Sequence, residues 1–168
     1  MTKFHLRTEQ ILQGHFTLQS LNLILIFQVN CPGCFIYALP LAAKLYERHR
    51  DRINILGLST AFEDFDLNTA ENTQKLLQSG EMVGVTRHYF QQKQIEQYPI
   101  PLEFAIAFDR ETFRINSLPG TPSWVAFDRE CNVLASWFGH QSEEEVESML
   151  HQHLGNTVRH QKLTSRIR

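Results

Sequence analysis

The chain has 168 residues, of which 42% are hydrophobic and 20% charged, a composition that suits one globular domain and excludes wholesale disorder. Its 16 basic and 18 acidic side chains give a net charge of −2, which argues against a nucleic-acid partner or an anionic membrane surface. No stretch approaches the roughly 18 apolar residues that a membrane helix needs, and the first ten residues lack the apolar core of a signal peptide. We therefore expect a cytoplasmic protein with no membrane partner.

The first half of the chain predicts two buried strands with a helix between them. Residues 23–29 are apolar except at Gln28 and include β-branched side chains, and the mostly apolar residues 53–59 are expected to form the second strand. Between them, apolar residues recur at a spacing of three and four: Ile36, Leu39, Ala43 and Tyr46. Pro40 interrupts that pattern, so the sequence predicts a helix with a kink near this proline.

The middle of the chain predicts two further helices and a third strand. Asn68 and Glu71 have the spacing of a capping box, which predicts a short helix running toward Leu77. A second helix is expected over residues 85–95, before the two prolines that follow, and residues 104–108 are expected to form a strand.

The last part of the chain predicts a hairpin and a terminal helix. Residues 124–127 and 133–138 form the arms of the hairpin, and Ser142 with Glu145 predicts the cap of the helix. Alternating strands and helices of this kind indicate an α/β fold with a mixed sheet. We expect one domain over residues 1–154 and, over residues 155–168, a basic C-terminal tail that is either solvated or a docking arm.

The strongest chemical signal is the sequence Cys31-Pro32-Gly33-Cys34, which falls where a buried strand ends and a helix begins. Free backbone N–H groups and the helix dipole favour a thiolate there, so the pKa of Cys31 should lie below the usual value of about 8.5. We expect Cys31 to be the exposed nucleophile and Cys34 the covered thiol that resolves a mixed disulfide. Pro32 presets a helical backbone angle, and Gly33 leaves the approach to the sulfurs uncrowded.

A second signal lies about ninety residues further along the chain. Thr121 and Pro122 lead directly into a predicted strand, where a proline is compatible with the sheet and where its peptide bond can be cis.

Together these features resemble the thioredoxin superfamily, within it the TlpA-like and AhpC/TSA-related redoxin branch. The resemblance rests on the CPGC motif between a strand and a kinked helix, on Gly120-Thr121-Pro122 opening the strand Trp124-Val125-Ala126-Phe127, and on Phe138-Gly139-His140 before the last helix. It covers about residues 15–154. It implies a thioredoxin-like fold, in which a central mixed sheet is flanked by helices and a helical insertion spans about residues 60–101, between the second and third core strands.

The resemblance also implies roles for individual residues. Cys31 and Cys34 would form the catalytic dithiol, and Thr121 with Pro122 would bind the substrate backbone. Pro32 and Gly33 complete the predicted substrate-binding set, and the insertion is the expected source of partner specificity.

The chain departs from the family pattern at the positions that usually handle protons. Asn30 replaces the common Trp before the first cysteine, residues 35–39 contain no Glu, and Leu25 stands where thioredoxin has a buried Asp. An acidic side chain of the insertion can substitute, or these acids form a solvated loop. The candidates are Glu63, Asp64 and Asp66.

Three other functions compete with a disulfide exchange enzyme. In a peroxiredoxin-like peroxidase Cys31 would attack a hydroperoxide, although Gln28 and Ile24 stand where such sites usually have Thr or Ser and Pro. A zinc site would need two further ligands, and Cys131 is alone in the sequence. A non-enzymatic adaptor would retain the scaffold without the chemistry.

From these features we expect a thiol–disulfide oxidoreductase that needs neither a metal nor an organic cofactor. Its partners would be a disulfide-containing protein or a small thiol substrate, and an upstream reductase that restores the dithiol. Cys131 is expected to be an incidental thiol rather than a third reactive one.

Overall fold

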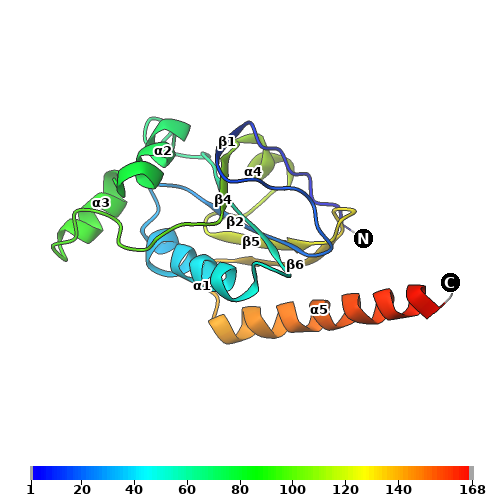
Figure 1. Cartoon of the computed structure of the whole chain (residues 1–168). Helices are drawn as coiled ribbons and strands as arrows, with labels where there is room; N and C mark the ends of the chain where they lie inside the picture. The colour runs from blue at the N-terminus through cyan, green and yellow to red at the C-terminus, as the bar shows by residue number, and fades with distance from the viewer. Residues whose placement is uncertain (1, 167–168) are drawn as a thin grey trace.

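The protein is described by a computed structural model that covers the backbone of residues 2–166 and the side chains of residues 2–154. A six-stranded mixed sheet forms its centre, with the strand order β1-β4-β3-β2-β5-β6 (Figure 1). The central strands β2 and β3 are parallel, as are β3 and β4, whereas β1, β5 and β6 run antiparallel to their neighbours. The strands are β1 (Gln10–Gln13), β2 (Asn22–Phe27), β3 (Asn54–Ser59), β4 (Ala105–Phe108), β5 (Ser123–Phe127) and β6 (Val133–Phe138).

Helices cover the two faces of this sheet unequally. They are the π-helical turn η1 (Cys34–Ala38), α1 (Leu39–His49), α2 (Ala70–Ser79), α3 (Gly84–Gln91), α4 (Glu111–Ile115) and α5 (Glu143–Arg166). The helices α1 and α5 bury their apolar sides in one large core, which α2 and α3 extend, while α4 and the N-terminal segment cover the other face. Figure 1 shows α2 and α3 together at one end of the molecule. Within the described residues no helix is both long and apolar enough to span a membrane.

The central strand β2 is buried along its whole length because both of its faces are covered. Leu23, Leu25 and Phe27 point into the core beneath α1, and Ile24 and Ile26 point into the smaller core on the opposite face. A strand of this kind is continuously apolar rather than alternating, which is why the run from Leu23 to Phe27 indicates a strand in the sequence. The strand ends at Phe27, two residues before the predicted end. The strands predicted over 53–59, 104–108, 124–127 and 133–138 are also present.

The irregularity predicted at Pro40 is a π-helical turn directly before it. The backbone N–H of Leu39 bonds to the carbonyl of Cys34, five residues earlier, but Pro40 has no N–H to offer the next carbonyl, that of Phe35. The hydroxyl of Tyr98 donates to this carbonyl instead, at 2.6 Å. Burial raises the pKa of Tyr98 well above its ordinary value, so the hydroxyl stays protonated and able to donate.

Two predicted helix boundaries in the insertion are wrong. Thr69, not Asn68, caps α2, because its hydroxyl accepts the N–H of Asn72 at 3.0 Å. The next helix ends at Gln91 rather than at residue 95, because the chain turns at Gln94, which has a positive φ of 61°. At the end of α2, Gly80 supplies the left-handed conformation that stops the helix.

The C-terminal helix begins as predicted, since the hydroxyl of Ser142 accepts the N–H of Glu145 at 3.1 Å. It continues to Arg166 instead of ending near residue 154. The prediction of a solvated tail or docking arm concerns side chains of residues 155–168, which lie outside the described part of the chain. The short elements β1 and α4 were not predicted.

Candidate functional site

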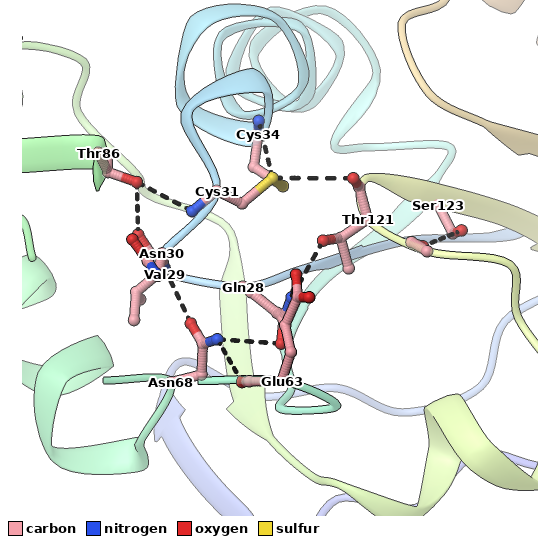
Figure 2. Close-up of a disulfide and its surroundings, with 11 residues drawn as sticks. Gln28, Val29, Asn30, Cys31, Cys34, Glu63, Asn68, Thr86, Thr121 and Ser123 are labelled. Atoms are coloured by element: carbon pink, nitrogen blue, oxygen red, sulfur yellow. Dashed lines mark hydrogen bonds between the residues drawn. A yellow bond between two sulfur atoms is a disulfide. The ribbon is translucent and has the colours of Figure 1, made fainter. Parts of the chain in front are cut away.

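Cys31 and Cys34 form a disulfide at the end of the central sheet (Figure 2). Cys31 lies on the loop that joins β2 to η1, here called the cysteine loop (residues 28–33), and Cys34 is the first residue of η1. Their Cα atoms are 5.4 Å apart. Cys34 is fully buried, whereas Cys31 is partly exposed. A partner can therefore approach the sulfur of Cys31 more easily than that of Cys34, as the sequence predicted.

The first helical turn supplies a hydrogen-bond donor to the more exposed sulfur. The backbone N–H of Cys34 points at the Sγ atom of Cys31, with an N–S distance of 3.3 Å. In the reduced protein this N–H would face a thiolate, which it stabilises relative to the neutral thiol. The geometry thus fits Cys31 as the nucleophile.

Thr121 and Pro122, which are joined by a cis peptide bond, lie next to the disulfide. The carbonyl oxygen of Thr121 is 3.7 Å from the Sγ atom of Cys31. The register of the sheet explains why they are close. Ser123, the first residue of β5, pairs with Ile26 near the end of β2, so the loop after β2 and the segment before β5 lie at the same edge of the sheet. The Thr121–Pro122 segment therefore lies beside Cys31.

Pro32 and Gly33, which separate the cysteines, are both partly exposed. A Cβ atom added to Gly33 would meet no atom within 4 Å, so the surface in front of the disulfide is open at this residue. The space is compatible with the approach of a second chain.

Behind the disulfide lies a buried amide, Gln28, three residues before Cys31. Its side-chain oxygen accepts the N–H of Phe62 and the amide of Asn68, each at 3.0 Å. Its nitrogen faces the hydroxyl of Thr121 at 3.4 Å and the carboxylate of Glu63 at 3.5 Å. Gln28 therefore links the cysteine loop, the insertion and the segment that carries Pro122.

The acidic loop of the insertion reaches this network through amide side chains. Glu63 contacts Gln28, and a carboxylate oxygen of Asp64 accepts the side-chain N–H of Asn30 at 2.8 Å. Asp66 is exposed. Of the three acids considered as proton carriers, Glu63 lies on the side of the site that holds Thr121, as Figure 2 shows.

Sequence reasoning missed two residues of the insertion that bond directly to the cysteine loop. Asn68 was assigned to a helix cap, but it is buried and its side-chain oxygen accepts the N–H of Asn30 at 2.8 Å. Sequence patterns indicate no role for Thr86, whose hydroxyl accepts the N–H of Cys31 at 2.9 Å. Nothing in the local sequence distinguishes such residues from ordinary polar helix positions.

The third cysteine lies in another part of the molecule. Cys131 occupies the β5–β6 hairpin with a positive φ of 65°, and it packs against the core on the face opposite the main one. Within residues 2–154 no three His, Cys, Asp or Glu side chains gather as a metal site would require.

No protein-family model matches the chain, and no curated protein does so. Solved structures do match. A thioredoxin-like superfamily protein is 23% identical with a TM-score of 0.71, over 92% of this chain and 97% of its own. A thiol-disulfide isomerase from Corynebacterium glutamicum is 22% identical with a TM-score of 0.70, over 91% and 96%. A protein from Chlorobium tepidum, described as a putative thiol:disulfide interchange protein DsbE, is 17% identical with a TM-score of 0.58, over 89% and 99%.

These similarities define the fold. The chain has a thioredoxin-like fold, in which a mixed sheet is flanked by helices and a CXXC pair stands at the end of a central strand. The predicted fold class is confirmed.

Proposed function

We propose that the chain is a thiol–disulfide oxidoreductase that uses the Cys31–Cys34 pair. The observation that carries the proposal is the disulfide itself, in which the partly exposed Cys31 lies beside the carbonyl of Thr121 and Cys34 is buried. Two of the similar structures are named as a thiol-disulfide isomerase and a thiol:disulfide interchange protein, which supports the same chemistry.

The reaction needs only the two thiols and a partner disulfide. The thiolate of Cys31 attacks one sulfur of that disulfide, the partner's S–S bond breaks, and its other sulfur leaves as a thiolate. Cys34 then loses its proton and attacks Cys31, which forms the Cys31–Cys34 bond and releases the partner's second thiolate. Two electrons have passed to the partner, and an upstream dithiol reductase must supply two electrons to the Cys31–Cys34 disulfide to restore the dithiol. Pro32, Gly33 and the Thr121–Pro122 segment would hold the partner's backbone.

The surface near the disulfide favours a protein substrate over a small thiol. Large apolar side chains are exposed on segments that contact the cysteine loop or the Thr121 segment. Val85 is 59% exposed and its N–H bonds to Asn30, while Phe65, 57% exposed, follows the Asp64 that bonds to the same residue. Exposed apolar side chains on segments that bond to the cysteine loop suit contact with a protein partner.

Replacing Val85 and Phe65 together with serine is expected to lower kcat/KM for reduction of a protein disulfide, such as those of insulin, by about tenfold, since each side chain buries apolar area against the partner. The rate with a small aromatic disulfide should not change. The matched control is Ile11→Ser on edge strand β1, where the side chain is 49% exposed. Equal losses with both substrates would contradict a role in docking.

A redox titration against glutathione buffers, followed by thiol alkylation and mass measurement, tests the function. The expected result is a reversible Cys31–Cys34 disulfide, and a potential of about −220 to −320 mV would assign a reductase role in the proposed cytoplasmic compartment. A clearly higher potential would assign an oxidant or isomerase. If no disulfide forms, the function is an adaptor or a zinc module instead. If hydrogen peroxide oxidises Cys31 faster than a protein disulfide does, the peroxidase is favoured.

A further inference from the structure

One hydroxyl of the insertion closes the backbone turn that carries Cys31. Thr86 lies on α3 and is fully buried. Its Oγ1 accepts the N–H of Cys31 at 2.9 Å and donates to the carbonyl oxygen of Val29 at 2.8 Å. Figure 2 shows the Thr86 side chain between these two backbone groups. The residue is 55 positions from Cys31 in the sequence, so only the packing of the insertion brings it there.

The neighbouring residue, Asn30, is held by the same insertion from two sides. Its backbone N–H and side-chain N–H bond to Asn68 and Asp64, and its side-chain oxygen accepts the N–H of Val85, all at 2.8 Å. Gly84 makes room for this contact: a Cβ there would lie 2.4 Å from the Asn30 oxygen, at a φ of 54° that also disfavours a side chain. The loop before the disulfide is therefore anchored to the insertion at both residues.

We propose that Thr86 is a positioning residue for the thiol–disulfide exchange, and this inference rests on the function proposed above. Thr86 does not touch the sulfur. It fixes the backbone of Cys31, so that the Sγ atom stays within 3.3 Å of the Cys34 nitrogen, whose N–H stabilises the thiolate. The insertion thereby positions the nucleophile through Thr86, in addition to supplying the proposed docking surface at Val85 and Phe65.

The test compares variants that remove or keep this hydroxyl. Thr86→Val preserves the shape but leaves the Cys31 N–H without an acceptor, and Thr86→Ser keeps the hydroxyl. With Thr86→Val we expect the pH profile of Cys31 alkylation in the reduced protein to move upward by about one unit, and exchange at neutral pH to slow about tenfold. Thr86→Ser should behave as the native protein. Thr86→Ala removes the hydroxyl without overpacking and must show the same shift.

Thr73→Val is the matched control. Thr73 is also fully buried in the insertion, but its hydroxyl bonds to Ser59 and to the carbonyl of Thr69. Its loss should lower stability and leave the alkylation profile in place. If the Thr86→Val and Thr86→Ala profiles match those of the native protein or of Thr73→Val, the positioning role is overturned while the oxidoreductase stands. If the native protein exchanges no disulfide, the function fails, and the alkylation profile still decides the role of Thr86.

Discussion

Cys34→Ser is expected to accumulate a covalent adduct with its disulfide substrate. Cys31 can still attack, because this residue is partly exposed and the surface at Gly33 is open. The second step is lost, since a serine hydroxyl at position 34 cannot displace the bound partner from Cys31. Non-reducing gel electrophoresis and intact mass should show a one-to-one mixed disulfide that dithiothreitol releases.

Cys31→Ser is expected to give no adduct and to reduce exchange to the level of buffer alone. The remaining thiol at Cys34 has no exposed surface from which to attack. Cys131→Ser, in the hairpin, is the matched control and should retain full exchange. An adduct formed by Cys31→Ser but not by Cys34→Ser would reverse the assigned roles. Loss of exchange in Cys131→Ser would place the chemistry at the third thiol.

The dithiol site could be predicted from sequence because its parts are local. A continuously apolar strand, two cysteines in the first helical turn and a proline inside the following helix are adjacent in the chain, and each has a physical signature. The Thr121–Pro122 segment was found through its position at the start of a strand. Antiparallel pairing of β5 with β2 then brings the two segments together.

The contacts between the cysteine loop and the insertion could not be predicted in this way. Asn68 and Thr69 are both good helix caps, and sequence alone favoured Asn68 because Glu71 follows at the right spacing. In the structure the side chain of Asn68 is engaged by Gln28 and Asn30, so Thr69 caps the helix instead. The choice depends on tertiary packing, which local spacing does not encode.

The edge strand β1 could not be predicted from the sequence for a related reason. The strand β1 consists of Gln10, Ile11, Leu12 and Gln13, whose two apolar residues are adjacent rather than alternating. It is held by pairing with β4, and the amide of Gln13 donates to the carbonyl oxygens of Leu102 and Phe104. Such a strand is defined by its neighbour more than by its own pattern.

Gln28 holds the cysteine loop, the insertion and the Thr121 segment together, so its replacement should have the largest effect on stability. In Gln28→Leu the partly buried N–H of Phe62 and the buried amide of Asn68 lose their shared acceptor. Each buried donor left without a partner destabilises the fold by about 1–3 kcal/mol. We therefore expect the free energy of unfolding to fall by about 2–5 kcal/mol, measured by denaturant titration of the oxidised protein.

Gln92→Leu is the matched control, because Gln92 is exposed and its side chain hydrogen-bonds to the exposed ring of His88. The same chemical change there should alter the free energy of unfolding by less than about 0.5 kcal/mol. A loss below about 1 kcal/mol in Gln28→Leu would mean that the insertion rearranges to satisfy these donors. In that case the insertion would be held to the sheet mainly by its apolar contacts, through Leu76 and Phe90, rather than by the buried amide.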